Sequence, residues 1–557
     1  MLKQVLTRKW GLRLLLLVFG AFLFLLPGRA SIPPFDRDEP RYMQATAQML
    51  ETHDFIDVRF QDKPRYLQPA GIYWLEAAAV SVSGTLKDRA VWAYRVPSLV
   101  AMTAAAGLTA WMGAILFGPS AGLMAGALLA TSVLAAAEGR MATIDSALLF
   151  AVLLAEAAVL SVLQDREAQR PTSAWWALLF WLALGCGLML KGPVVLIPGL
   201  GTPLTLALVE RNGSWLRRLR FQWGWLVMLA VVVPWCVAIG LISHGEFFQR
   251  AVGRNFLGKI GQGQEAHGGF PGFHLAVFAL AFWPGSFFAV AAFPFIWARR
   301  KIWQFQFLLC WIVPHWIVFE LIATKLPHYV LPTYPAIAIL TAAALCKTEQ
   351  GWLWPQKRWG RVLIGFYGCI CLAIGSALAV AGIVLSIVLE GHAPVEAWLG
   401  MVGSVPPLVL AARNVVVGKM KRAALSAMAA AVVIYTSLFL GVIPRLHSIW
   451  LAPRLVSMVE RHKSCPDSRV MSSSFSEPSF VFLMHGNVSL DTPDAAASML
   501  SKNSQCGLAL VAQKDFPTFA ASAQKYSVQL NEYERIKGFN YSTGKWLDIG
   551  LYGAHPQ

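Results

Sequence analysis

The stretch from Phe35 to Arg65 concentrates charged side chains in a chain that is otherwise mostly apolar. Carboxylates organise or deprotonate a nucleophile, whereas ammonium and guanidinium groups hold an anionic leaving group. A solvated loop also tolerates charges, but alternating acids and cations between two apolar runs predict a site for an anionic substrate. The charged residues are Asp36, Arg37, Asp38, Glu39, Arg41, Asp62, Lys63 and Arg65.

Two carboxylates are the candidate catalytic groups, Asp38 and Asp145. Asp38 precedes Glu39 and Pro40 at the predicted start of a helix, so service as its N-cap is the simple alternative. Asp145 lies at the outer end of an apolar run near Arg140, where a cap or an ion pair is the simple alternative. An ionisable group at such depth nevertheless predicts a functional site.

Three lysines, Lys63, Lys191 and Lys325, fall near loop ends on the predicted outer side, against the usual trend of membrane proteins. Each could be an ordinary surface residue. Together they suggest attraction of a phosphate or diphosphate group. His328 and Tyr329 follow Lys325 at the mouth of the same helix.

His267 lies near the end of a glycine-rich loop over residues 253–269, which has no Walker spacing and which we interpret as a mobile gate. A lone histidine is more often a hydrogen-bonding residue than a ligand. Together with Asp62 or Glu265, however, His267 offers ligands for a divalent metal, and no motif specifies another cofactor.

The composition identifies an integral membrane protein. Of the 557 residues, 56% are hydrophobic and only 14% are charged, whereas soluble domains carry about 25% charged residues. The net charge of +17 does not indicate nucleic acid, because the basic residues fall mainly in short loops between apolar runs. Few charges lie within those runs, which argues against an ion-driven transporter.

Apolar runs long enough to span a membrane recur about thirteen times. The first run could be a signal peptide, but its length of about 17 residues favours a retained anchor. Basic residues gather in alternate loops, which places the N-terminus inside and, after an odd number of spans, the C-terminus outside. The runs are predicted at 11–27, 93–116, 119–137, 143–163, 174–190, 193–209, 223–242, 272–297, 303–323, 329–346, 360–389, 396–415 and 424–444.

Two segments are predicted outside the membrane on the same side. The first outer loop, 28–92, contains a helix beginning at Asp38, expected at the membrane interface, and a second helix over 69–83. In the tail, the runs SRVMSSS, GLALVAQ and WLDIGLYG alternate with short helical patterns, which predicts an α/β domain. Cys465 and Cys506 lie in this tail, where a disulfide is plausible in an oxidising compartment.

The fold class is thus an α-helical polytopic membrane protein with a small C-terminal α/β domain. We place the transmembrane domain at residues 1–445, including the outer loop 28–92, and the α/β domain at residues 446–557.

Several sequence blocks resemble the GT-C glycosyltransferases of the protein-mannosyltransferase clan, and especially the bacterial branch that includes 4-amino-4-deoxy-L-arabinose (lipid A) transferase. Each block alone is weak, but the set is specific, and the helix number and large first outer loop agree with a GT-C fold. The blocks occur in the family's order over residues 10–345: FDRDEPRY, QDKPRYLQPAGIYW, MATIDSALLF, KGPVVLIPG, EAHGGFPGFHLAVFALAFWPGSF and ATKLPHYVLPTYPA.

The resemblance implies an inverting glycosyltransferase in the bacterial inner membrane with its active site and C-terminal domain in the periplasm. It implies transfer of a sugar, 4-amino-4-deoxy-L-arabinose or a related one, from an undecaprenyl-phosphate-linked donor to lipid A. Asp38 and Asp145 match the family's two acidic positions, and Lys63 matches the lysine thought to hold the donor phosphate. Asp62 stands where glutamate is usual at a candidate metal position.

His267 and Tyr329 match the histidine of the long loop and the tyrosine of the Lys-Leu-Pro-x-Tyr motif. Arg65, Tyr66 and His328 depart from the family pattern, and these departures concern the identity of the sugar and not the reaction class. The predicted substrate-binding residues are Glu39, Arg41, Tyr42, Lys63, Lys191, His267, Lys325 and Tyr329; the predicted metal ligands are Asp62 and His267.

Two alternatives remain. A protein O-mannosyltransferase-like activity, or transfer of another sugar such as galacturonic acid from a polyprenyl phosphate, lies within the same enzyme class, with a glycan or protein as acceptor. A flippase for a lipid-linked sugar belongs to a different class. The acceptor also decides the role of Asp38, because a hydroxyl needs a general base whereas a lipid A phosphate is already ionised.

Overall fold

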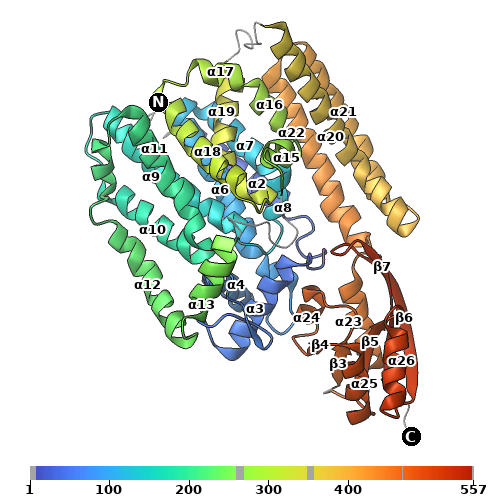
Figure 1. The fold of residues 1–557 in the computed structure, drawn as a ribbon. Helices are drawn as coiled ribbons and strands as arrows, with labels where there is room; N and C mark the ends of the chain where they lie inside the picture. Colours follow the sequence, from blue (N-terminus) through green and yellow to red (C-terminus); the bar gives the residue numbers. More distant parts are fainter. Residues whose placement is uncertain (1–7, 259–268, 348–356, 467, 555–557) are drawn as a thin grey trace.

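The computed structural model describes residues 8–258, 269–347, 357–466 and 468–554. A large helical bundle carries a small sheet-containing domain at one end, and the helices of the first outer loop lie at that same end (Figure 1). The overall class predicted from composition and periodicity is confirmed.

Nine helices within the described ranges are long and apolar enough to cross a membrane, so the chain is a multi-pass membrane protein. Each predicted apolar run coincides with one bundle element or with consecutive elements. The bundle elements are α2 (Arg8–Leu25), α5 (Val91–Tyr94), α6 (Val96–Phe117), α7 (Pro119–Thr131), α8 (Val133–Glu138), α9 (Asp145–Glu167), α10 (Ala174–Lys191), η1 (Gly192–Val195), α11 (Leu196–Glu210), η2 (Ser214–Leu219), α12 (Trp225–Ile242), α13 (Glu246–Phe248), η3 (Gln249–Leu257), α15 (Phe273–Ala281), α16 (Ser286–Ala291), α17 (Phe293–Ala298), α18 (Trp303–Leu321), η4 (Pro327–Thr333), α19 (Tyr334–Lys347), α20 (Arg358–Glu390), α21 (Val395–Val416), α22 (Met420–Ser437), η5 (Leu438–Val442) and η6 (Ile443–Arg445).

Three breaks between bundle elements matter for function. The α7–α8 segment ends at Glu138, and α10 ends at Lys191 because Gly192 adopts φ +66°, a conformation that favours glycine. After α18, the chain enters α19 through the short helix η4, which contains His328 and Tyr329. Such interrupted helices are tolerated at membrane depth where they line a cavity. Here they deliver polar side chains to one place.

The first outer loop folds as α3 (Asp38–Thr52), the hairpin β1 (Arg59–Phe60) and β2 (Lys63–Pro64), and α4 (Gly71–Ser83). We expected the helix that begins at Asp38 to lie at the membrane interface, and the structure shows that it is packed within the protein. Met43 and Ala47 of α3 are fully buried in a cluster with Phe482 of the C-terminal domain. The helix has α4 on one side and the C-terminal domain on the other, so it is internal.

The C-terminal domain is a mixed sheet with helices. Its strands lie in the order β4-β3-β5-β7-β6, with β4, β3 and β5 parallel and β7 antiparallel to both β5 and β6. The disulfide Cys465–Cys506 is present, which confirms that prediction. The elements are α23 (Leu451–His462), β3 (Arg469–Ser472), α24 (Pro478–Leu483), β4 (Val488–Leu490), α25 (Pro493–Lys502), β5 (Gly507–Ala512), α26 (Phe516–Lys525), β6 (Leu530–Asn540) and β7 (Lys545–Ala554).

Candidate active site

A polar cavity lies where the first outer loop meets the bundle, with a volume of about 320 Å³. Both predicted catalytic acids, Asp38 and Asp145, line it, so the loop and the bundle each contribute one carboxylate. Cations from both parts of the chain join them. The polar and charged side chains of the lining are Asp36, Arg37, Asp38, Glu39, Arg41, Tyr42, Arg65, Gln68, Glu138, Thr143, Asp145, Lys191, Asn255, Thr324, His328 and Tyr329.

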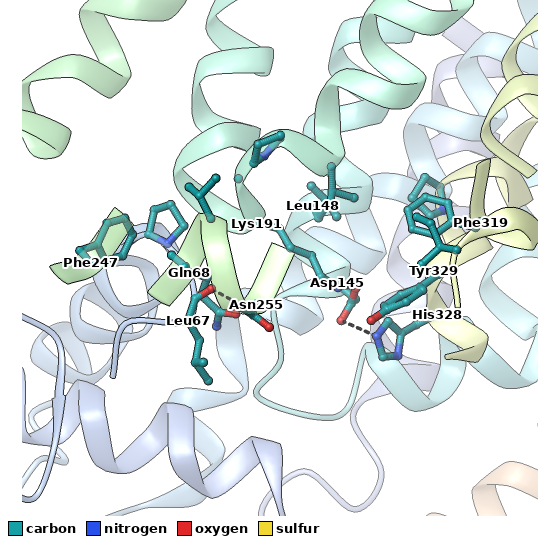
Figure 2. A pocket seen from close by; sticks show the side chains of 18 residues that line it. Leu67, Gln68, Asp145, Leu148, Lys191, Phe247, Asn255, Phe319, His328 and Tyr329 are labelled. Atoms are coloured by element: carbon teal, nitrogen blue, oxygen red, sulfur yellow. Dashed lines mark hydrogen bonds and ion pairs between the residues drawn. The ribbon is translucent and has the colours of Figure 1, made fainter. Parts of the chain in front are cut away.

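An apolar cavity of about 160 Å³ adjoins the polar one, and Figure 2 shows its lining. Leu148, Phe247 and Phe319 contribute carbon surface to it. Asp145 and Lys191 lie at its polar end, because both residues line both cavities. The two cavities thus form one amphipathic cleft, which can take a ligand with a charged head and a hydrocarbon tail.

The centre of the cleft is the ion pair between Lys191 and Asp145. The Lys191 Nζ donates to Asp145 Oδ1 at 2.5 Å, and the two side chains are only 19% and 9% exposed. Lys191 Nζ also lies 5.6 Å from the centre of the Tyr329 ring, a cation–π distance. Three residues that the sequence predicted separately therefore meet here: Lys191 from the end of α10, Asp145 from the start of α9 and Tyr329 from η4.

Glu138 and His328 complete this centre, and the site prediction included neither. His328 Nδ1 lies 3.8 Å from Glu138 Oε1, and its Nε2 lies 3.9 Å from Asp145 Oδ2 (Figure 2 shows the latter pair). Thr143 donates its hydroxyl to Glu138 Oε2 at 2.7 Å. Ligand atoms of Glu138, Asp145 and His328 all lie within 4.8 Å of one another, so these three residues could hold a metal ion.

Asp38 lies in the first turn of α3, and Arg37 occupies the N-cap position. The prediction that Asp38 is the N-cap is therefore wrong, because the helix begins one residue earlier than we expected. The Asp38 side chain is 73% exposed and lies 3.5 Å from Arg41 Nη1. Its carboxylate is thus accessible from the polar cavity and is not committed to holding the helix.

Glu39 was predicted to bind substrate, but its contacts give it a structural role. Arg95 donates Nε and Nη2 to its two carboxylate oxygens at 2.7 and 2.8 Å, and both side chains are about 1% exposed. The backbone N–H groups of Phe35 and Ala142 also donate to Glu39, each at 2.7 Å. Both carboxylate oxygens are therefore occupied, and Glu39 fastens the start of α3 to the bundle.

Arg65 lines the polar cavity, whereas Lys63, within the described range 8–258, is not among the lining residues of either cavity. Arg65 is 9% exposed, donates Nε to the Tyr73 hydroxyl at 2.9 Å and lies 5.2 Å from the centre of the Tyr42 ring. The predicted binding residue Tyr42 lines the same cavity and packs against Arg65 there. The chain after the β1–β2 hairpin thus brings Arg65 to the cleft, two residues after the predicted lysine, in addition to Arg37 and Arg41 from the start of α3.

The remaining predicted residues lie elsewhere. Lys325 Nζ donates to the backbone carbonyls of Glu320 and Ile322 at 2.6 and 2.9 Å, so it closes the end of α18 and is not directed at substrate. Asp62 lines a separate hollow between the first loop and the C-terminal domain. His267 lies outside the described residues.

Comparisons with known proteins agree with this architecture. Residues 34–246 match the family model of dolichyl-phosphate-mannose-protein mannosyltransferase. An undecaprenyl phosphate-alpha-4-amino-4-deoxy-L-arabinose arabinosyl transferase of Pectobacterium carotovorum is 27% identical over 384 residues, 67% of this chain and 65% of that protein. The enzyme of that description from Pseudomonas aeruginosa PAO1 is 29% identical over 349 residues, 61% of this chain and 60% of that protein.

Both alignments span less than two thirds of the relatives' own length. The crystal structure of ArnT from Cupriavidus metallidurans bound to undecaprenyl phosphate has the same fold, with a TM-score of 0.76 and 19% identity over 98% of this chain and 99% of that one. These matches agree with the resemblance to the GT-C glycosyltransferases of the protein-mannosyltransferase clan that the sequence blocks show, and the fold is that of ArnT. Within that clan the chain is similar to the bacterial aminoarabinose transferases.

Proposed function

We propose that this chain transfers 4-amino-4-deoxy-L-arabinose or a related sugar from an undecaprenyl-phosphate-linked donor to lipid A. The junction of a polar and an apolar cavity at Asp145 and Lys191 carries the proposal, because such a donor joins a charged head to a hydrocarbon chain. The names of the relatives, which are undecaprenyl phosphate-aminoarabinose transferases, support this donor and sugar.

In this reaction the bond between the anomeric carbon and the phosphate oxygen breaks. Its electron pair leaves with undecaprenyl phosphate, while an acceptor oxygen attacks from the opposite face and inverts the anomeric centre. Lys191 and Arg65 neutralise the charge that develops on the departing phosphate, and their burial strengthens the interaction. Asp145 positions Lys191. Asp38, on the loop side of the polar cavity, orients the acceptor and, for a hydroxyl acceptor, takes its proton.

The periplasmic face of the inner membrane is the proposed location. The first loop and the C-terminal domain contact one another at one end of the bundle, and the basic loops of the charge pattern belong to the other end. Because basic loops remain in the cytoplasm, the cleft faces outward. A donor at that face must already be attached to a lipid, since nucleotide sugars are used in the cytoplasm.

Mass spectrometry of lipid A is the direct test. The purified full chain in lipid vesicles is given the lipid-linked aminoarabinose donor and lipid A, with Asp145→Asn as the inactive comparison. We expect lipid A to gain the mass of one pentosamine as undecaprenyl phosphate is released. If lipid A instead gained the mass of another sugar when the lipid-linked donor of that sugar was supplied, the sugar assigned here would have to be changed. Movement of the donor across the bilayer without a new glycosidic bond would replace the transferase with a flippase.

We also propose that a divalent cation binds Glu138, Asp145 and His328, in place of the predicted pair Asp62 and His267. The oxygen and nitrogen atoms of these three side chains fit such an ion. Asp145 Oδ1 accepts a hydrogen bond from Lys191, while Asp145 Oδ2 faces His328. Glu138 and Asp145 are largely buried carboxylates, 5% and 8% exposed, and buried carboxylates favour a cation as partner. When bound, the cation would supply additional positive charge for the donor phosphate.

Elemental analysis after exposure to Mn²⁺ and desalting tests this metal site. We expect one ion per chain in the wild type and loss of it in Glu138→Gln and His328→Ala, with the ion retained in Asp62→Asn. Retention in both cleft variants, or loss in Asp62→Asn alone, would contradict the assignment. Differential scanning fluorimetry verifies that the variants are folded.

A further inference from the structure

The residues directly before Asp38 are held by the C-terminal domain. Asp36 accepts two hydrogen bonds from Ser479, from its backbone N–H to Oδ1 at 2.9 Å and from its hydroxyl to Oδ2 at 2.7 Å. The Asp36 backbone N–H donates to the Tyr541 hydroxyl at 2.7 Å. Ser479 lies in α24 and Tyr541 in the turn between β6 and β7, so two separate elements of the domain converge on one residue.

Neighbouring residues extend this attachment. Arg37 Nε lies 3.6 Å from Glu477 Oε2, and Asn540 donates to the other oxygen of Glu477 at 2.9 Å. The Phe35 ring packs edge-on against Trp450, with ring centres 5.3 Å apart. We call Phe35, Asp36 and Arg37, together with these partners in the C-terminal domain, the latch.

The start of α3 is thereby fixed from two sides. Glu39 ties it to Arg95 of the bundle, and the latch ties it to the C-terminal domain. Asp38 lies between these two attachments, with its carboxylate towards the polar cavity. Asp145 and Lys191 belong to bundle helices, so their ion pair does not depend on the latch.

We propose that Asp36 is a positioning residue through which the C-terminal domain sets the location of Asp38, so that the catalytic cleft is complete only when this domain is docked. The catalytic part of this inference rests on the proposed sugar transfer, while the docking part does not. Loss of the latch shifts the start of α3, and Asp38 with it, while Lys191 keeps its ion pair with Asp145 in the bundle. Donor KM is therefore preserved and kcat falls, because small displacements of a reacting group cost about 100-fold in rate.

The latch also responds to pH. Burial raises the pKa of Asp36 from 3.8 to about 7, as do the carboxylates of Glu477 and Glu39, while the hydrogen bonds from Ser479 oppose the rise. Arg37 and Tyr541 are the other titratable groups that face it. A freed Asp36 would return towards its ordinary pKa, so the docked state holds a proton that the undocked state releases between these values. Docking is therefore strongest at low pH and weakens as pH rises through about 7.

The test compares Asp36→Ala and Asp36→Asn in the full chain, with Asp88→Asn as control because Asp88 is an exposed acid of the same loop. Hydrogen exchange of the backbone over residues 35–44 and steady-state kinetics are measured at pH 6 and pH 8. We expect Asp36→Ala to accelerate exchange there at both pH values and to lower kcat about 10- to 100-fold with donor KM nearly unchanged.

Asp36→Asn keeps acceptor and donor atoms for Ser479 without a titrating charge. We therefore expect near-wild-type kcat at pH 6, and protection factors over residues 35–44 that no longer change between pH 6 and pH 8. Asp88→Asn should behave as the wild type. Wild-type exchange and kcat in Asp36→Ala would overturn the proposal, as would an equal fall of kcat in the Asp88 control. The exchange measurement needs no substrate, so the docking result stands apart from any failure of the proposed transfer reaction.

Discussion

Replacement of Lys191 with methionine is expected to lower kcat/KM by about 100- to 1,000-fold, the scale seen when one preorganised charge is removed from a reacting centre. Lys191 is the ammonium at the junction of the polar and apolar cavities, where a lipid phosphate would lie. Methionine retains most of its packing volume but leaves Asp145 without its 2.5 Å partner. The donor phosphate then meets uncompensated negative charge, so both binding and departure are impaired.

The measurement is the initial rate of pentosamine transfer to lipid A at several donor concentrations. Lys87→Met serves as the control, because Lys87 is an exposed lysine of the first loop away from the cleft. Lys63→Met gives a second comparison: its position outside both cavities predicts a smaller loss than Lys191→Met. If the Lys191→Met protein worked at the wild-type rate, or if Lys63→Met had the larger defect, the phosphate-binding role would be assigned to Lys63 in the β1–β2 hairpin instead.

The bundle could be predicted from sequence because membrane helices are specified locally. A run of apolar residues long enough to span must satisfy its backbone internally, and every such run here coincides with helical elements. The strands β3, β5 and β7 were found for a similar reason, since β5 is buried at all six positions and reads as a continuous apolar run. The strand β6 was missed because its sequence, LNEYERIKGFN, is charged and half-exposed.

The site was predicted less completely because contacts between distant segments decide which charges reach the cleft. Lys325 and Lys191 look alike in sequence, each near the end of an apolar run. Lys191 pairs with Asp145 across two helices, whereas Lys325 turns back onto the carbonyls that end its own helix. Spacing along the chain cannot distinguish a lysine that pairs with a distant carboxylate from one that binds nearby backbone carbonyls, because either partner supplies the hydrogen bonds that a buried ammonium needs.

Glu138 and His328 were missed for related reasons. Glu138 follows an alanine-rich run and has no motif around it, and His328 was noted beside Lys325 and as a departure from the family pattern but was given no role in the site. A signal did exist in both cases, since an ionisable group at the end of an apolar run favours a cavity or a partner. That rule selected Asp145 and would have selected Glu138 had it been applied to every such position.

Replacement of Asp38 with asparagine is expected to lower kcat about 100-fold with little change in donor KM, because the proposed role of Asp38 is towards the acceptor, whereas Lys191 and Arg65 hold the donor phosphate. Asparagine keeps the shape and the hydrogen bond that Arg41 can donate, so the change removes only the charge. The measurement is kcat for lipid A against pH, with Asp88→Asn as the matched acid-to-amide control.

The acceptor sets the pH profile of this variant. A lipid A phosphate is ionised near neutral pH and needs no general base, so the residual rate of Asp38→Asn should follow the wild-type profile at a lower level. A hydroxyl acceptor requires proton removal, and the residual rate would then rise with pH as hydroxide replaces the missing base. Retention of most of the wild-type kcat in Asp38→Asn would remove Asp38 from the reaction and leave Asp145 and Lys191 as the catalytic centre.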